Sequence, residues 1–468
     1  MDANAAQEAA LRRAVDALRG VVPVEEALRL VMLLGLLRHQ AESSRSTDEL
    51  YSASRSYAWD EVRSGVDGDH LHEVIARGVR DWQMDRGHRV DLPVPDLHAL
   101  RGARVYDVVG VVAQAPSPVR LFDLVLQAQS REAKGGHYFT PSGVARLMVE
   151  LLDPREGDSV HDPACGSGGL LIESAAHVAA RGGAAGRLRL FGQDVSASAL
   201  ATAEMNIGIR DLDALLVGTE SSLLRDGFPD RTFDVVAVNP PFNMSRWDGG
   251  YGRHDEHWPL GVPPQGNANF AWVQVCLKKL APGGKAGILL PTGAATGTRG
   301  AERDIRAHLV DQGLLTAVVE LPAGIIPHVR NPMCLWIMSG FRGAGPVRQP
   351  GEVLLVDARE TAVTVDKRQR ILPGEAIGRI SDTFASWLGR SGARSYADRP
   401  GWCRSVPLVE LAAQEHDVLP SRHVPAQGID ETDFGGHRQL SDLTAELEHH
   451  FDESNRLERE LRHMLGIR

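Results

Sequence analysis

The stretch Ser159-Val-His-Asp-Pro-Ala-Cys-Gly-Ser-Gly-Gly169 decides the fold of this 468-residue chain. It is typical of a short strand, Ser159–His161, followed by a glycine-rich turn and the start of a helix. Glycines at such a turn let a ligand approach the backbone closely. The turn by itself fits either a bound dinucleotide or a simple tight turn. Neither Gly-x-Gly-x-x-Gly nor a P-loop ending in Gly-Lys-Ser/Thr is present. The acidic Asp162 suits a cationic or hydroxyl-bearing ligand better than a pyrophosphate.

Outward from this stretch, short apolar runs alternate with helical segments. The predicted strands are Ser159–His161, Leu188–Gly192, Ala214–Val217, Phe233–Val238, Ala286–Leu290, Leu314–Leu321 and Cys334–Met338. This alternation predicts an α/β fold with a doubly wound, mainly parallel sheet. The last two runs lack a helix-length segment between them, so we expect them to form an antiparallel pair. Glu352–Val356 is predicted as an additional strand.

The regions on either side of this pattern differ from it in composition and in the spacing of apolar residues. Residues 1–120 are predicted to form a helical N-terminal domain, because they are rich in good helix formers and in apolar residues at helical spacing. Residues 121–358 form the α/β domain, and residues 359–438 are expected to be irregular. Residues 439–468 predict a helical tail with apolar residues at six of eight heptad seam positions. The tail either docks onto its own chain or binds a partner.

The composition is that of an ordinary globular protein, with 43% hydrophobic and 24% charged residues. The longest apolar run near the N-terminus, Leu30–Leu37, is far below the ~20 residues of a membrane span. No signal segment opens the chain, and the 4 cysteines match no zinc pattern, so we expect reduced thiols in the cytoplasm. The net charge of −10 requires a local basic patch or a partner to supply positive surface if the protein meets DNA.

Two further motifs follow predicted strands. In Phe191-Gly-Gln-Asp194 the carboxylate is placed either to accept both hydroxyls of a ribose or to cap the helix that follows. In Asn239-Pro-Pro-Phe242 the prolines end the strand abruptly. The Asn239 side-chain oxygen and the Pro240 carbonyl could then accept from one amino group, while Phe242 stacks on a planar ring. A simple strand-ending turn is the alternative.

Together these motifs resemble the amino-methyltransferases that use S-adenosylmethionine, in particular the methylase subunit of type I restriction-modification systems, which methylates adenine in DNA. The resemblance runs from about Leu121 to Gly340. The cofactor segment precedes the glycine-rich loop, which precedes the catalytic motif, as in this class of adenine methylases. The further matching segments are Gly136-His-Tyr-Phe-Thr-Pro141, Gly266-Asn-Ala-Asn-Phe-Ala-Trp272, Leu280-Ala-Pro-Gly-Gly-Lys285 and Leu289-Leu-Pro-Thr-Gly293.

The resemblance implies a Rossmann-like methyltransferase with no metal. Its implied catalytic residues are Asn239, Pro240, Pro241 and Phe242. Its implied cofactor-binding residues are Tyr138, Phe139, Thr140, Pro141, Asp162, Ala164, Gly166, Gly168, Gly169 and Asp194.

The implied chemistry can be put in physical terms. The adenine amine is a poor nucleophile because its lone pair is delocalised into the ring. Hydrogen bonds to Asn239 and to the Pro240 carbonyl would localise that lone pair, and orientation would supply much of the acceleration. The base must first leave the DNA helix, so we expect it to flip onto Phe242.

Three positions depart from the family pattern. Gly218-Thr219 stands where Gly-Asp is usual, which predicts weaker cofactor binding. Ile325 and Ile326 stand where an aromatic residue often stacks on the flipped base, a contact worth about 1–3 kcal/mol. Asn331-Pro332 replaces a common Ile-Pro pair.

The resemblance also implies partners. Double-stranded DNA is the expected substrate, and a separate specificity subunit is expected to choose the sequence. About 110 residues follow the catalytic domain, which is short for two target-recognition domains. A restriction subunit is a further candidate partner. Two alternatives stay open: an amino-methyltransferase acting on RNA or on protein glutamine, and a DNA- or cofactor-binding subunit with impaired catalysis.

Overall fold

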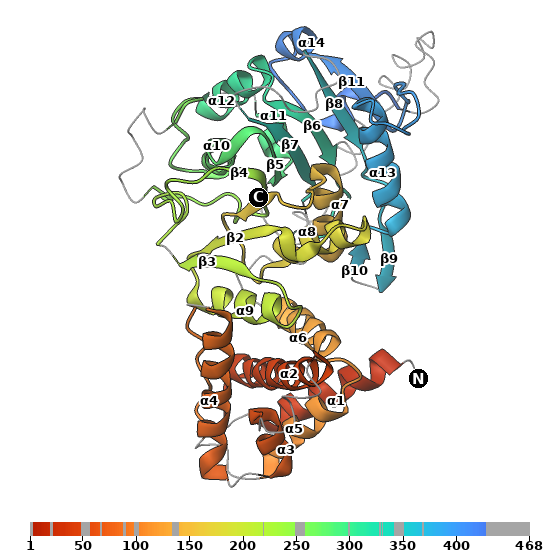
Figure 1. Ribbon diagram of the computed structural model, residues 1–468. Helices are drawn as coiled ribbons and strands as arrows, with labels where there is room; N and C mark the ends of the chain where they lie inside the picture. The colour runs from red at the N-terminus through yellow and green to blue at the C-terminus, as the bar shows by residue number, and fades with distance from the viewer. Residues whose placement is uncertain are drawn as a thin grey trace, which may run out of the picture. The chain divides into compact units, whose positions relative to one another are not determined.

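A computed structural model of the chain describes residues 3–18, 22–47, 57–65, 68–87, 90–97, 103–132, 140–218, 220–248, 258–297, 300–326, 329, 331–340, 351–366 and 369–426. The first six helices are α1 (Ala3–Leu18), α2 (Val24–Thr47), α3 (Ala58–Ser64), α4 (Gly68–Arg86), α5 (Ala103–Gln114) and α6 (Pro118–Glu132) (Figure 1). They share one hydrophobic core. The apolar run Leu30–Leu37 lies in α2, and every residue of the run is buried. None of the helices described is long and apolar enough to cross a membrane.

A nine-stranded sheet lies beyond these helices. Its order is β11-β8-β6-β7-β5-β4-β1-β2-β3. The strands are β1 (Ser159–Asp162), β2 (Arg189–Asp194), β3 (Ala214–Gly218), β4 (Phe233–Val238), β5 (Leu280–Pro291), β6 (Leu315–Glu320), β7 (Met333–Ser339), β8 (Glu352–Asp357) and β11 (Cys403–Pro407). Five of the eight strand pairs are parallel. The predicted antiparallel pairing is confirmed, because β7 lies antiparallel to β6 and also to β5.

Helices cover both faces of the sheet. Successive side chains of a strand point to opposite faces, so Val235 and Ala237 join one core while Val236 and Val238 join the other. The first core is closed by α7 (Ser142–Leu152), α8 (Gly169–Ala180) and α13 (Gly374–Trp387). The second is closed by α10 (Asn269–Lys278) and α12 (Gly300–Asp311). The fold is therefore the doubly wound α/β architecture that the sequence predicts.

Helix α9 (Ala197–Gly208) belongs to two cores at once. Its Ala203 and Ile207 pack with the sheet, whereas Ala201 and Met205 pack with the N-terminal helices. Gly208 ends this helix against Trp82, and a Cβ there would lie 2.2 Å from the indole ring. Only glycine allows so close an approach.

The stretch expected to be irregular, residues 359–438, is largely regular as far as residue 426. It contains β9 (Val363–Asp366), β10 (Gln369–Ile371), α13, β11, α14 (Leu408–Ala413) and α15 (Pro420–His423). The expectation was wrong because β11 is a short edge strand whose order comes from its long-range pairing with β8. The predicted tail, 439–468, lies outside the described residues, and the domain limits at 120, 358 and 438 remain predictions.

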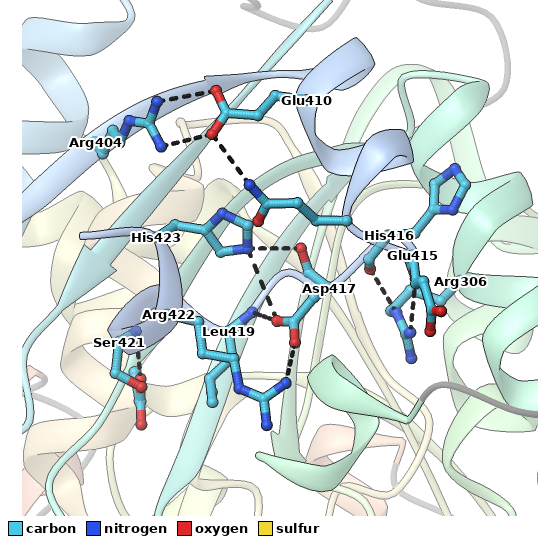
Figure 2. Close-up of polar contacts among 12 residues, drawn as sticks. Arg306, Arg404, Glu410, Glu415, His416, Asp417, Leu419, Ser421, Arg422 and His423 are labelled. Carbon is cyan, nitrogen blue, oxygen red and sulfur yellow. Dashed lines mark hydrogen bonds and ion pairs between the residues drawn. The ribbon is translucent and has the colours of Figure 1, made fainter. Parts of the chain in front are cut away.

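A buried arginine holds the last described segment to the body of the fold (Figure 2). Arg306 of α12 is 1% exposed and donates to four backbone carbonyls. Its Nε lies 2.7 Å from the His416 oxygen, and its guanidinium nitrogens also reach Glu415, Ala294 and Gly297. The last two carbonyls belong to α11 (Gly293–Thr296) and its C-cap, directly after β5. One side chain therefore satisfies backbone groups from two segments more than 100 residues apart in sequence.

Replacing Arg306 with methionine is expected to lower the free energy of unfolding by about 3–5 kcal/mol, because carbonyls would stay buried without a donor. Urea unfolding followed by circular dichroism measures the change. Arg404→Met is the matched control, since Arg404 pairs with Glu410 near the surface, where both side chains are about 30% exposed. Arg404→Met should lower the free energy of unfolding by about 1 kcal/mol or less. Equal losses in the two variants would contradict the anchoring role of Arg306.

Candidate active site

The candidate site lies at the point where the strand order changes direction. The chain runs from β1 outward through β2 and β3, then returns to place β4 on the other side of β1. The parallel pairing of His161 with Val236 brings the carboxyl ends of β1 and β4 together. Asp162 and Asn239 therefore both lie at the edge where doubly wound sheets bind ligands.

The loop between β1 and α8 is fastened by three hydrogen bonds, two to the end of β2 and one from α9. The Cys165 backbone N–H donates to Gln193 O at 2.9 Å, and the Gly166 N–H donates to Asp194 Oδ2 at 2.9 Å. From α9, Asn206 Nδ2 donates to Ser167 O at 2.7 Å. Gly166 and Gly168 have φ values of 52° and 78°, which side chains rarely adopt. The glycines of this loop are thus required by its backbone.

Asp162 is a buried carboxylate, with 2% of its surface exposed. Its Oδ1 accepts from the Ala164 N–H at 3.0 Å. Burial, together with the nearby charge of Asp194, raises the pKa of Asp162 to about 8. A carboxyl group that is poised in this way ionises readily when a positive charge arrives.

Asp194 fastens the loop rather than capping the helix that follows. Its Oδ1 accepts from the Ser196 N–H at 2.8 Å, and Oδ2 accepts from Gly166. Ser196 is the N-cap of α9, because its side chain accepts from the Ala199 N–H. The helix-cap alternative for Asp194 is therefore wrong. Each carboxylate oxygen keeps a second lone pair, so a hydroxyl-bearing ligand can still be held.

A small pocket opens between these groups. It is lined by Thr140, Asp162, Ala164, Cys165, Ser167, Gly169 and Leu170. The first turn of α8 faces this loop, and its N-cap, Gly168, has no side chain to bond the N–H groups there. The helix end favours a carboxylate, and Asp162 favours a cation, so the pocket suits a zwitterionic group. Burial raises the pKa of the Cys165 thiol well above its ordinary value, so this cysteine is no nucleophile.

Asn239 directly follows β4, and one of its side-chain atoms is an acceptor that has no partner among the described residues. The side chain is 5% exposed, and its Nδ2 donates to Thr140 Oγ1 at 3.1 Å. Its Oδ1 is buried without a hydrogen bond. A buried acceptor left unpaired costs about 1–3 kcal/mol, so such an atom is typical of a group that awaits a ligand donor.

The rest of the motif follows directly. Pro240 is buried, whereas Pro241 and Phe242 are partly exposed. Phe242 packs at the border of the core that contains Ile325 and Ile326, and both isoleucines are almost fully buried. Pro141 precedes α7, and Tyr138, Phe139 and Thr219 lie outside the described residues.

Sequence reasoning missed a pair of asparagines behind this motif. Asn243 has a φ of 55° and is held by the buried Asn269 at the start of α10. The Asn243 N–H donates to Asn269 Oδ1 at 3.0 Å, and Asn269 Nδ2 donates back to Asn243 Oδ1 at 3.1 Å. The segment Gly266–Trp272 contains Asn269, but its spacing says nothing about which loop that side chain reaches. The pair holds the turn that carries Phe242.

Comparison with known proteins gives matches over most of the chain. The model of the N-6 DNA methylase family matches residues 121–432. The chain is 31% identical over 340 residues to the type I restriction enzyme HindI methylase subunit of Haemophilus influenzae, covering 72% of this chain and 75% of that protein. It is 30% identical to the MjaIX methylase subunit of Methanocaldococcus jannaschii, covering 71% of this chain and 59% of that longer protein.

Solved structures show the same fold. A type I restriction-modification methyltransferase subunit from Streptococcus thermophilus is similar with a TM-score of 0.71 at 20% identity, covering 90% of this chain and 99% of that one. A modification subunit of a putative type I restriction enzyme from Vibrio vulnificus gives a TM-score of 0.63 at 18% identity, covering 88% and 94%.

Proposed function

Because this chain belongs to the N-6 DNA methylase family, we propose that it transfers a methyl group from S-adenosylmethionine to the exocyclic amine of adenine in double-stranded DNA, with Asn239 at the catalytic centre. The observation that carries the proposal is the buried, unpaired Oδ1 of Asn239 beside a pocket that contains a buried carboxylate. We further propose that the chain is the methylase subunit of a type I restriction-modification enzyme and works with separate specificity and restriction subunits, as the names of its relatives suggest. Its described cysteines are buried free thiols, which supports action in the cytoplasm.

The charged and polar groups at and beside the pocket suit the cofactor. Asp162 would face its positive groups, the N-terminus of α8 its carboxylate, and Asp194 its ribose hydroxyls. When bound, S-adenosylmethionine supplies an electrophilic methyl group on a sulfonium centre. The remaining assigned positions, Thr140, Pro141, Ala164, Gly166, Gly168 and Gly169, would shape the backbone around it. Tyr138 and Phe139 are also proposed to bind the cofactor, on the basis of the family pattern alone.

The protein's own groups prepare the adenine amine. Asn239 Oδ1 accepts one amine hydrogen, and the Pro240 carbonyl accepts the other, so the nitrogen lone pair is drawn out of the ring. Thr140 fixes the Asn239 amide by accepting from its Nδ2, which directs Oδ1 away from Thr140. Pro241 keeps the turn rigid, and Phe242 gives the extruded base a face on which to stack. These groups are placed before the substrate arrives, so little reorganisation is needed.

Methyl transfer from labelled cofactor tests this function directly. The protein is co-expressed with its neighbouring specificity candidate and assayed on duplex DNA that lacks adenine methylation, on RNA and on protein. Label in N6-methyladenine of the DNA alone is the expected result. Label in RNA or in protein glutamine, or no label despite measurable cofactor binding, would contradict it.

Cofactor binding should tighten as pH rises from 6 to 7.5. With its pKa near 8, Asp162 is protonated in the free protein across this range, and a cationic ligand favours its ionised form. Binding then releases about one proton, so affinity should rise by up to about tenfold per pH unit. The cofactor's amino group stays mostly protonated up to about pH 7.7. Isothermal titration calorimetry in buffers of different ionisation enthalpy measures both quantities.

Asp162→Asn is the matched control, and it should bind the cofactor more weakly, with no such pH dependence.

The same raised pKa of Asp162 makes the folded protein without cofactor less stable as pH rises. The unfolded chain ionises Asp162 near its ordinary pKa of 3.8 and the folded chain near 8, so this group lowers stability progressively between those values. If cofactor affinity in Asp162→Asn keeps the pH dependence of the wild type, a group other than Asp162 titrates.

A further inference from the structure

A two-stranded ribbon, β9–β10, stands apart from the nine-stranded sheet and forms a sheet of its own. Figure 1 shows it below α13, in blue. The strands are antiparallel, with Ile371 opposite Val363. Val363, Val365 and Ile371 are 51%, 60% and 39% exposed, and Thr364 between them is exposed as well. Three of the eight large apolar side chains that are exposed in the described residues therefore lie within nine positions.

The base of this ribbon is fixed next to the candidate active site. Arg370 Nη1 donates to Ala323 O at 2.7 Å, in the segment that follows β6 and leads to Ile325 and Ile326. Leu372 is buried against the start of α7, where a Cβ at Gly143 would lie 2.8 Å from the Leu372 oxygen. Gly143 lies three residues after Thr140, the residue that holds Asn239. The ribbon is thus anchored both to the segment that leads to Ile325 and to the segment that follows Thr140.

The charge of this segment is opposite to that of the whole chain. From Val363 to Ile371 the sequence carries Lys367, Arg368 and Arg370 against one acid, Asp366, a net charge of 3 − 1 = +2. The complete chain has a net charge of −10. A local cationic segment in an acidic protein favours a polyanionic partner. A protein partner would also suit the exposed valines, but only an acidic protein would match the local charge, whereas every DNA duplex does.

We propose that the β9–β10 ribbon enters a groove of the DNA duplex beside the extruded adenine. This inference rests on the proposed function. A two-stranded ribbon fits the major groove, and branched apolar side chains suit contact with thymine methyl groups and base edges. The anchors at Ala323 and Gly143 place the ribbon close to the target base, so it would support the duplex where the base has left the stack.

Site-specific crosslinking in the assembled methylase tests this inference. A photoreactive benzophenone amino acid replaces Val365 in one variant and Val409 in the other. Val409 of α14 is 79% exposed and serves as the matched apolar control. We expect a DNA crosslink from position 365 and none from position 409. A crosslink from 365 only to a protein subunit or to a second copy of the chain, or no crosslink in an enzyme that methylates DNA, would overturn the proposal.

A second pair of variants measures the contribution to DNA binding. Val363→Glu/Val365→Glu should weaken DNA affinity about tenfold at low salt, because two negative charges face the phosphates. Cofactor affinity should stay unchanged, as should DNA affinity in the Val409→Glu control. Unchanged DNA affinity in the double variant would overturn the proposal, whereas a wild-type enzyme that methylates no DNA would refute the proposed function itself.

Discussion

Replacing Asn239 with alanine will reduce methyl transfer to duplex adenine by about a hundredfold to a thousandfold, while cofactor binding stays within about twofold. The variant loses a buried acceptor, Asn239 Oδ1, that has no hydrogen-bond partner among the described residues. Without it, nothing on that side draws the amine lone pair out of the adenine ring. Single-turnover methyl transfer at saturating DNA measures the loss, and calorimetric titration with S-adenosylhomocysteine measures cofactor binding.

Thr140→Val separates the acceptor itself from its positioning. Valine keeps the shape of threonine but cannot accept from Asn239 Nδ2, so the amide becomes free to turn. We expect a loss of about tenfold, smaller than that of Asn239→Ala, because the acceptor is still present. Should Asn239→Ala keep more than a tenth of the wild-type rate, the catalytic assignment would be wrong.

Replacing Asp194 with alanine will weaken cofactor binding by about a hundredfold. This carboxylate has two tasks, because it holds the Gly166 N–H in place and is proposed to accept the ribose hydroxyls. The first task contributes through the shape of the loop, and the second contributes through direct contact. Calorimetric titration of wild type and variant with S-adenosylhomocysteine measures the combined loss.

A cofactor analogue that lacks the ribose 2′-hydroxyl tells the two tasks apart. It should bind wild type about tenfold more weakly than the parent compound, since a hydrogen bond to a charged group is lost. In Asp194→Ala both compounds should bind equally. If the variant still discriminates between them, the ribose hydroxyl is held elsewhere and Asp194 only shapes the loop.

The parts of the fold that the sequence predicts best are those with local signals. Each buried parallel strand is a short apolar run, and a turn motif such as Asp162–Gly169 or Asn239–Phe242 marks its carboxyl end. The alternation of strands and helices then follows, because parallel strands need long crossover connections that are usually helical. The antiparallel β6–β7 pair was also predictable, since no helix-length segment separates its strands.

The parts that the sequence does not reveal depend on contacts between distant segments. The edge strand Cys403–Pro407 is short and mixes polar with apolar residues, and it gains its order through long-range pairing with β8. The partnership of Asn243 with Asn269 and the four carbonyls around Arg306 likewise join segments that no periodicity connects. Within the candidate site, residue types could be predicted. That Asn239 Oδ1 is unpaired and that Asp194 fastens the loop could not be predicted, because both depend on residues that are distant in sequence.

The position of helix α9 between two cores determines how this chain is expected to unfold. One side of it completes the core of the N-terminal helices, and the other side, through Ile207, supports Gly168 of the cofactor loop. Because α9 contributes side chains to both cores, we expect the two regions to share their most protected amides. Hydrogen exchange should therefore show a single slow class that spans α2, α9 and the central strands. Denaturant should reveal one cooperative transition instead of a helical region that melts first.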